Sequence, residues 1–261
     1  MSKGVEKIVD IGAAAYVEQV ESLVGEVARS QAEPVRRAAA VITAALRAGG
    51  VVNAFGSGHS EAIAMEIAGR AGGLVPTNRL ALRDVVVYGG EPVSLLTAAN
   101  ARELERDPTI AQRIYDLAPV RPEDVFVLIS SSGVNGSIVE LAGIVKRHGH
   151  ELIAITSVRH STAMPSRHPS GHKLLDLADV VLDNGAPYGD AVMPLPGGSS
   201  TGAVSTITSA LLAQMVVAEV VRELLEAGET PPMYRSVNVA GGDEHNRALE
   251  ARYAGRIRRG A

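Results

Sequence analysis

A short run of glycine, serine and histidine holds the first side chains in this sequence that could do chemistry. Residues 56–60 read Gly-Ser-Gly-His-Ser. They follow an apolar stretch typical of a buried strand, residues 51–55, and precede apolar residues at helical spacing in 61–72. Ser60 is a favourable N-cap, and Glu61 lies in the first turn, where a carboxylate is stabilised. Backbone N–H groups and hydroxyls would converge at this helix N-terminus, which indicates an anion-binding site.

Two further strands are predicted to end in polar loops. Residues 125–130 form an apolar run of the buried parallel type, and residues 130–137 read Ser-Ser-Ser-Gly-Val-Asn-Gly-Ser before a helix expected to end at His148. A strand expected over 152–156 ends in Thr-Ser at 156–157. Carboxyl ends of parallel strands meet at one edge of a sheet, so these loops face one crevice. One such loop could simply cap a helix. Together they favour a site for a phosphate group, held without a lysine.

Two common nucleotide-binding motifs are missing. A dinucleotide fingerprint needs a third glycine, where Glu61 stands, and an acidic residue ending the second strand, where Thr77 and Asn78 stand. A Walker loop needs Gly-Lys-Ser/Thr, which the sequence does not contain. We therefore do not expect a nucleotide at these loops.

The rest of the chain alternates between helices and strands. We expect helices over 5–29, 34–47 and 201–227, short strands over 74–77 and 180–183, a strand or covering segment over 85–88, helical pieces over 91–117, loops over 158–173 and 189–200, and an irregular tail from 231. Strand–loop–helix units in succession predict an α/β fold with a parallel sheet between two helical layers. The 201–227 helix is mostly apolar, which we interpret as an oligomer interface.

Length and composition limit the possible classes of protein. The chain has 261 residues, 46% of them apolar, with a net charge of −4 and no cysteine. That length favours one large domain, and the lack of a basic block argues against a nucleic acid partner. No disulfide framework is possible. The longest apolar stretch, 210–221, contains Gln214 and Glu219 and is too short to span a bilayer. The N-terminus lacks the apolar core of a signal peptide, so we expect a soluble cytoplasmic protein without membrane contact.

The loops carry a resemblance to a known family. The run at 56–60 and the Ser-rich loop at 130–135 resemble the SIS (sugar isomerase) domain, and through it phosphoheptose isomerases. Together with Arg-Ala-Gly-Gly-Leu at 70–74, Ser-Arg-His-x-Ser-Gly at 166–171 and Pro-Pro-x-x-Arg-Ser-x-Asn-Val at 231–239, they are similar to the UPF0309 family of bacterial SIS proteins. The resemblance covers nearly the whole chain.

The resemblance implies a three-layer, flavodoxin-like fold with a five-stranded parallel sheet. We expect an N-terminal helical segment over 1–50, a phosphosugar-binding SIS domain over 51–230 and a C-terminal arm over 231–261. The resemblance also implies a homodimer or homotetramer with active sites shared between subunits. The arm carries Arg235, which could fold over a neighbouring subunit's crevice or simply pack for dimerisation. The candidate binding residues are Ser57, Gly58, Ser60, Ser130, Ser131, Ser132, Asn135, Ser157 and Arg235.

Isomerisation of a sugar phosphate and 2,3-elimination from it make the same chemical demand. A base removes the proton next to a carbonyl, and an acid assists the oxygen that gains charge or leaves. In this family an acidic residue usually follows the glycine loop on its helix, and Glu66 matches it. We take Glu66 as the base, with His59 or His168 assisting. Glu66 could instead be a surface residue, and Glu61 is a second candidate, although helix-dipole stabilisation explains it more simply.

Neither a metal nor an organic cofactor is expected. The sequence has no cysteine and no His-Glu-x-x-His. His168 and His172 are four residues apart, but Pro169 and Gly171 lie between them and disfavour a helical pair of metal ligands.

The rival function is a non-catalytic phosphosugar sensor or regulatory subunit. Such proteins usually carry a helix-turn-helix, but the residues before the first strand offer two helices and no basic recognition helix. Isomerisation and elimination both remain open.

Overall fold

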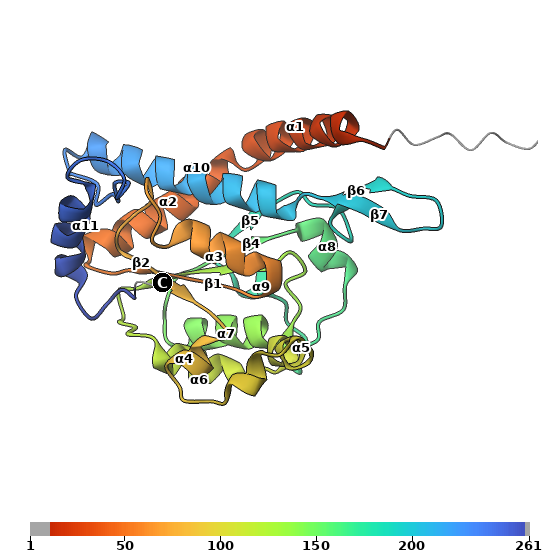
Figure 1. Ribbon diagram of the computed structural model, residues 1–261, viewed down its shortest axis with the longest axis horizontal. Helices are drawn as coiled ribbons and strands as arrows, with labels where there is room; N and C mark the ends of the chain where they lie inside the picture. The colour runs from red at the N-terminus through yellow and green to blue at the C-terminus, as the bar shows by residue number, and fades with distance from the viewer. Residues whose placement is uncertain (1–10, 259–261) are drawn as a thin grey trace, which may run out of the picture.

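The computed structural model describes residues 11–258 and has a five-stranded parallel sheet at its centre (Figure 1). The strand order is β2-β1-β3-β4-β5. The strands are β1 (Val52–Gly56), β2 (Thr77–Leu80), β3 (Val125–Ile129), β4 (Leu152–Thr156) and β5 (Val180–Asp183). The predicted α/β fold, with a five-stranded parallel sheet between helices, is confirmed.

Helices cover both faces of the sheet. One face carries α1 (Ala13–Ser30), α2 (Ala32–Arg47), α3 (Glu61–Ile67) and α10 (Ser205–Glu226). The other carries α4 (Asp84–Val87), α5 (Ala98–Arg106), α6 (Ile110–Leu117), α7 (Gly136–Arg147) and α9 (Leu174–Leu177). The remaining elements are the helices α8 (Val158–Ala163) and α11 (Gly242–Glu250), the antiparallel strands β6 (Ala191–Pro194) and β7 (Ser200–Ala203), and the 3-10 turns Gly58–Ser60, Val93–Leu96 and Ala251–Tyr253.

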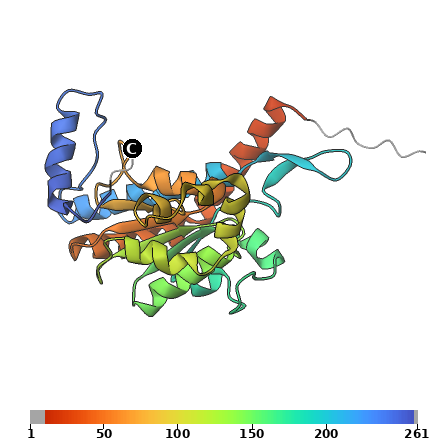
Figure 2. The ribbon, with the colours of Figure 1, turned by 60° about the horizontal axis from the view of Figure 1, so that its bottom comes forward.

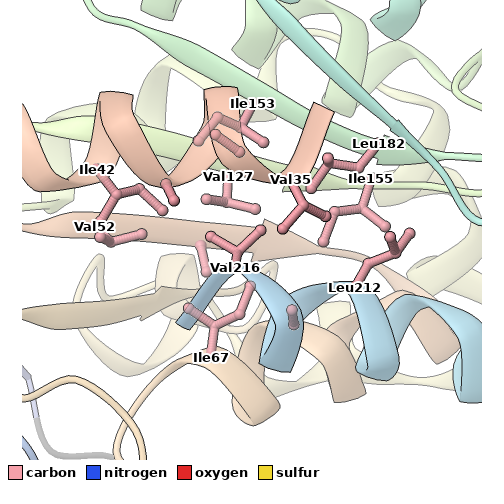
Figure 3. Packing of buried hydrophobic residues seen from close by; sticks show 14 of the residues in the cluster. Val35, Ile42, Val52, Ile67, Val127, Ile153, Ile155, Leu182, Leu212 and Val216 are labelled. Atoms are coloured by element: carbon pink, nitrogen blue, oxygen red, sulfur yellow. The ribbon is translucent and has the colours of Figure 1, made fainter. Parts of the chain in front are cut away.

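Alternating side chains on the buried strands fill two cores. In β3, Val125 and Val127 face the α2–α10 layer, while Phe126 and Leu128 face the α6–α7 layer. All residues of β3 are buried, which explains why its sequence is a continuous apolar run. Figure 3 shows the first of these cores. Its labelled side chains come from the helices α2, α3 and α10 and from the strands, and they point toward one another: Val35, Ile42, Val52, Ile67, Val127, Ile153, Ile155, Leu182, Leu212 and Val216.

The apolar character of α10 is explained within one subunit. The helix packs against α2 and α3, and its buried residues include Leu212, Val216 and Val220. Its most exposed large apolar side chains are Ile207 and Leu225. The apolar sequence of this helix is therefore no evidence for an oligomer interface.

Several predicted element boundaries are wrong. The second strand is 77–80 instead of 74–77, because Leu74 and Val75 pair with the C-terminal arm at Met233 and Pro232. Residues 85–88 belong to a helical turn, and the helix from Glu61 ends at Ile67. Loop 158–173 contains α8, loop 189–200 contains most of a β-hairpin, the long helix starts at 205, and the tail contains α11. The first helix begins at Ala13, and the part predicted over 5–10 lies outside the described residues.

The C-terminal arm covers the exposed edge of β2. The Asn78 side chain donates a hydrogen bond to the Arg256 carbonyl at 2.6 Å and accepts one from the Arg258 N–H at 2.7 Å. The Arg256 guanidinium is buried and donates to Asp124 Oδ1 at 2.5 Å. Asp124 also accepts a hydrogen bond from the Val51 N–H, 2.9 Å away, just before β1. The arm therefore protects an edge strand that would otherwise be open to pairing.

The N-terminal half of α1 and the β6–β7 hairpin project together from the body (Figures 1 and 2). The Tyr16 hydroxyl donates to the Ala203 carbonyl at 2.6 Å and ties the two elements to each other. The nearby Ile11 and Val17 are 44% and 50% exposed, so this projection carries uncovered apolar side chains.

No helix among residues 11–258 combines the length and the apolar character needed to cross a membrane.

A buried histidine predicts how stability depends on pH. His150 is 3% exposed; its Nδ1 lies 3.1 Å from the Asp124 carbonyl and its Nε2 lies 2.8 Å from the Tyr115 hydroxyl. Burial lowers the pKa of this imidazole, although the contact with Asp124 opposes the shift. The unfolded chain therefore binds this proton at a higher pH than the folded chain does. The free energy of unfolding should fall below about pH 6.5, by up to about 1.4 kcal/mol per pH unit.

Urea denaturation from about pH 7.5 to about pH 5 tests this effect. His150→Gln should lose that part of the pH dependence, and it should also be less stable than the native protein at the upper end of the range. His148→Gln is the matched control, since His148 is exposed and only two residues away. Equal slopes for His150→Gln and the native protein would contradict the prediction.

Gly136 predicts a stability effect at the contact between α5 and α7. A Cβ atom on Gly136 would overlap the carbonyl oxygen of Arg106. Gly136→Ala should therefore lower the free energy of unfolding by about 1–3 kcal/mol, the usual cost of overpacking. Gly143 on the same helix is the control, because a Cβ atom there meets only the movable Arg147 guanidinium. Gly143→Ala should raise stability by up to about 1 kcal/mol. Equal denaturation midpoints for the two variants would contradict the prediction, because they would mean that α5 moves away from the added methyl group at little cost.

Candidate functional site

The first polar loop makes a tight turn between β1 and α3. Gly58 has a φ of +56°, a backbone conformation that glycine adopts readily. A Cβ atom on Gly56 would overlap the Ser60 backbone, so this position also needs glycine. The Ser60 N–H donates to the Ser57 carbonyl at 3.1 Å and closes the turn. His59 is exposed, and its side chain makes no hydrogen bond to any described residue.

The second polar loop joins β3 to α7 and is held from within. The Gly133 N–H donates to Ser130 Oγ at 3.1 Å, and Gly133 has a φ of +63°. Gly133 packs closely against Thr156, Ser161 and Leu174. The loop leads directly into α7, whose N-cap residue is Asn135 in an extended conformation. The backbone N–H groups of the first turn of α7 lie next to this loop, as a bound anion requires.

The end of β4 supports the second loop from behind. The Ser157 N–H donates to the Ser131 carbonyl at 3.1 Å, and the Asn184 amide donates to Ser131 Oγ at 3.3 Å. Ser157 is fully buried, and its hydroxyl donates to the Ala186 carbonyl at 2.6 Å. The structure therefore places Ser157 beside the loop but occupies its hydroxyl. Ser60 and Ser132 are partly exposed, and their hydroxyls make no hydrogen bond to any part of residues 11–258.

A carboxylate that the sequence motifs do not include joins the two loops. Glu105, near the end of α5, accepts hydrogen bonds at Oε1 from Ser57 Oγ at 2.9 Å and from Asn135 Nδ2 at 2.8 Å. Its own backbone carbonyl accepts a third, from Ser137 Oγ at 2.8 Å. Only the position of Glu105 indicates a function in the sequence. A carboxylate in the last turn of a helix is destabilised by the negative end of the helix dipole, so a residue kept there can be expected to have another role.

A basic loop holds the N-terminus of α7 from the other side. Arg167 donates from Nη1 to Asn135 Oδ1 at 2.9 Å, and its backbone N–H donates to the Val134 carbonyl at 3.0 Å. Arg167 is exposed, so its positive charge stands at the rim of the second loop. This arginine belongs to the Ser-Arg-His motif but is not among the predicted binding residues.

His168 is brought near the second loop, but other side chains hold it. Its Nε2 lies 2.9 Å from Glu140 Oε2 on α7, and its Nδ1 lies 2.7 Å from Ser170 Oγ. Burial alone would raise the pKa of the Glu140 carboxyl, but hydrogen bonds from Arg147 and His168 outweigh it and hold that pKa below its ordinary value. His168 thus fastens its loop to α7, and a role in proton transfer stays a prediction.

Glu66 lies on the side of α3 that faces α10. Its Oε1 accepts a hydrogen bond from Gln214 Nε2 at 2.7 Å and pairs with the Arg70 guanidinium. Its side chain is 24% exposed. Glu61 lies at the start of the same helix, 3.9 Å from the Arg83 guanidinium. Neither carboxylate makes a hydrogen bond or an ion pair with the second loop within the described residues.

Arg235 is not brought to these loops within its own chain. The neighbouring Tyr234 pairs with Gly72 and Gly73, beyond the end of α3 and close to the start of β2. The Arg235 backbone is fixed by Asn246 of α11, at 2.9 Å from its N–H. In Figure 1, α11 lies at the opposite end of the sheet from β6 and β7. Arg235 could act at the predicted site only from another subunit.

The described residues contain no group of three or more histidine, aspartate and glutamate side chains arranged to hold a metal ion. The site consists of hydroxyls, amides, backbone N–H groups, one carboxylate and one guanidinium. Such a set can bind a phosphate group and move a proton.

Comparison with known proteins shows the family of this chain. The SIS domain family profile matches residues 15–157. A UPF0309 protein of Listeria monocytogenes is 37% identical over 244 residues, covering 93% of this chain and 97% of that protein. A UPF0309 protein of Geobacillus kaustophilus is 35% identical over 243 residues, covering 93% and 94%.

The fold is similar to that of a solved enzyme. Phosphoheptose isomerase GmhA of Neisseria gonorrhoeae superposes with a TM-score of 0.52 and 19% identity, over 79% of this chain and 95% of that one. That likeness concerns the fold alone. With the family match over more than half of the chain and the full-length relatives, it confirms the resemblance seen in the sequence. The chain belongs to the UPF0309 family of SIS domain proteins.

Proposed function

We propose that this protein binds a sugar phosphate at the loops after β1 and β3 and moves the proton next to the sugar carbonyl. The result is isomerisation or 2,3-elimination. The observation that carries the proposal is the junction of Ser57, Glu105 and Asn135, which joins both polar loops at the carboxyl edge of the sheet. Membership of the SIS family supports a phosphosugar ligand.

The phosphate group is proposed to bind at the second loop. The N-terminus of α7 offers backbone N–H groups and the positive end of the helix dipole. The hydroxyls of Ser130, Ser131 and Ser132 line the same loop, and Ser60 adds one from the first loop. Arg167 supplies the positive charge that the loop otherwise lacks. This set replaces the lysine of other phosphate-binding loops.

The reaction begins once the sugar is in its open-chain form. A base takes the C2 proton, the C–H electron pair forms the C1=C2 bond, and the carbonyl π pair moves onto O1 to give an enediolate. Return of the proton to C1, with transfer of the C2 hydroxyl proton to O1, gives the isomer, whereas departure of a C3 oxygen substituent gives an unsaturated product. Glu66 stays our sequence-based candidate for the base, with His59 or His168 assisting. His59 is well exposed for contact with a ligand.

We propose that the working form is a homodimer or homotetramer with shared active sites. The uncovered apolar side chains on the projection of α1 and the β6–β7 hairpin support this. Arg235 would then serve the crevice of a neighbouring subunit. Analytical ultracentrifugation should give at least twice the 27.2 kDa of one chain. A monomer at all concentrations would contradict this part of the proposal.

Proton NMR in deuterated water tests the proposed reaction. The purified protein is mixed with a panel of hexose, N-acetylamino-sugar and heptose phosphates. Deuterium at C1 or C2 with a ketose product would identify an isomerase, and deuterium at C2 with an unsaturated product would identify a lyase. Binding without exchange on every panel member would favour the rival function, a non-catalytic phosphosugar sensor.

Arg167 gives a prediction for binding of the phosphate group. Arg167→Ala should weaken binding of the best panel member by about 10- to 100-fold, the usual value of a hydrogen bond to a charged group. Isothermal titration at low and high salt measures it, and the loss should shrink as salt screens the charge. Arg159→Ala is the control, because Arg159 is exposed on α8 and faces the groove beside α1. Equal affinities for the two variants would remove Arg167 from the site.

A further inference from the structure

We propose that Glu105 is the general base that takes the C2 proton, in place of Glu66. This inference rests on the proposed function. It concerns a residue outside the sequence motifs, on helix α5, which lies between β2 and β3 in the sequence.

The two oxygens of Glu105 have different surroundings. Oε1 accepts both side-chain hydrogen bonds, from Ser57 of the first loop and Asn135 of the second. Oε2 accepts none from any described residue, and the side chain is only half-buried. One oxygen is therefore fixed by neutral donors while the other is left to take a proton. A base needs this combination of fixed geometry and a free acceptor.

The backbone that carries Glu105 is fixed as well. Ser137 of α7 donates to the Glu105 carbonyl, and the next residue, Arg106, packs against Gly136 so closely that no side chain fits between them. Hydrogen bonds and packing thus hold the carboxylate at the start of α7. A catalytic group held by its supporting contacts needs little reorganisation during the reaction.

Glu66 has surroundings of another kind. It pairs with the positively charged Arg70, and its Oε1 also accepts from Gln214 of α10. The contact with Gln214 connects α3 to α10, and no hydrogen bond or ion pair connects Glu66 to the second loop within residues 11–258. The hydrogen bonds of Glu105 instead reach both polar loops, and this placement favours Glu105 as the base.

The charges at the edge also orient the substrate. A phosphate group next to the Glu105 carboxylate would be repelled, so the phosphate lies on the Arg167 side of Asn135. The carbonyl end of the sugar then lies on the Glu105 side. In the proposed step the C2–H bond breaks, its electron pair forms the C1=C2 bond, the carbonyl π pair moves onto O1, and the proton goes to Glu105 Oε2. In isomerisation the same carboxyl returns that proton to C1 while the proton of the C2 hydroxyl passes to O1, so the carbonyl moves to C2 and no external oxidant or reductant is needed.

Deuterium exchange at C2 of the active panel sugar tests the inference, with Glu105→Gln as the main variant. Glutamine keeps an oxygen that accepts from Ser57 and Asn135, so the fold and the binding of the sugar phosphate should persist. The exchange rate should fall by about 100-fold or more, as expected for loss of a general base. Glu105→Asp keeps the carboxylate and should retain more exchange than Glu105→Gln, whereas a purely structural role predicts no such order.

Glu103→Gln is the matched control. Glu103 lies on the same helix and is exposed, and it should leave exchange unchanged. Glu66→Gln is measured in parallel. Full exchange in Glu105→Gln, or loss of both binding and exchange in that variant, would overturn the inference. If Glu66→Gln alone abolishes exchange, the base is Glu66. Absence of exchange by the native protein on every panel sugar would instead reject the proposed function, which separates the two failures.

Discussion

The pairing of β1 with β3 is the constraint on which the site depends. The two strands are parallel neighbours in which Gly56 lies opposite Ile129, so the chain leaves both at the same level of the sheet. Everything between them in sequence, including β2 and the helices α4 to α6, must return to the start of β3. The return packs α5 against the first turn of α7. Ser57, Glu105 and Asn135 come from separate segments and meet only because of this topology.

Much of the frame could be predicted because its signals are local. The apolar runs of β1, β3 and β4 are buried on both faces, so composition alone identifies them. Gly58 and Gly133 have positive φ angles, and a glycine in a polar loop after a strand is the usual sign of such a turn. The neighbouring positions of the two loops follow from the rule for parallel sheets. The fold, the family and the loops of the site were therefore accessible from the sequence.

What could not be predicted depends on partners distant in sequence. The apolar pattern predicts the second strand too early in the chain, because Leu74 and Val75 pair with an arm more than 150 residues away. The apolar α10 suggested a partner subunit, but α2 and α3 of the same chain cover it. Glu105 lies in a charged helix without a motif, and only its contacts with both loops distinguish it from Glu103. Glu66 had the better sequence pattern, and its contacts lead to α10 instead.

The amide of Asn135 solves an electrostatic problem at this edge. The Glu105 carboxylate lies beside the proposed phosphate site, and two negative groups in direct contact would repel each other. Asn135 donates through Nδ2 to Glu105 and accepts through Oδ1 from Arg167, so both neighbours fix the orientation of its amide. Its dipole is thus aligned with both charges. An aspartate would repel Glu105, and a lysine or arginine could not accept from Arg167. A neutral residue with both a donor and an acceptor is what this position requires, and the amide of asparagine provides both.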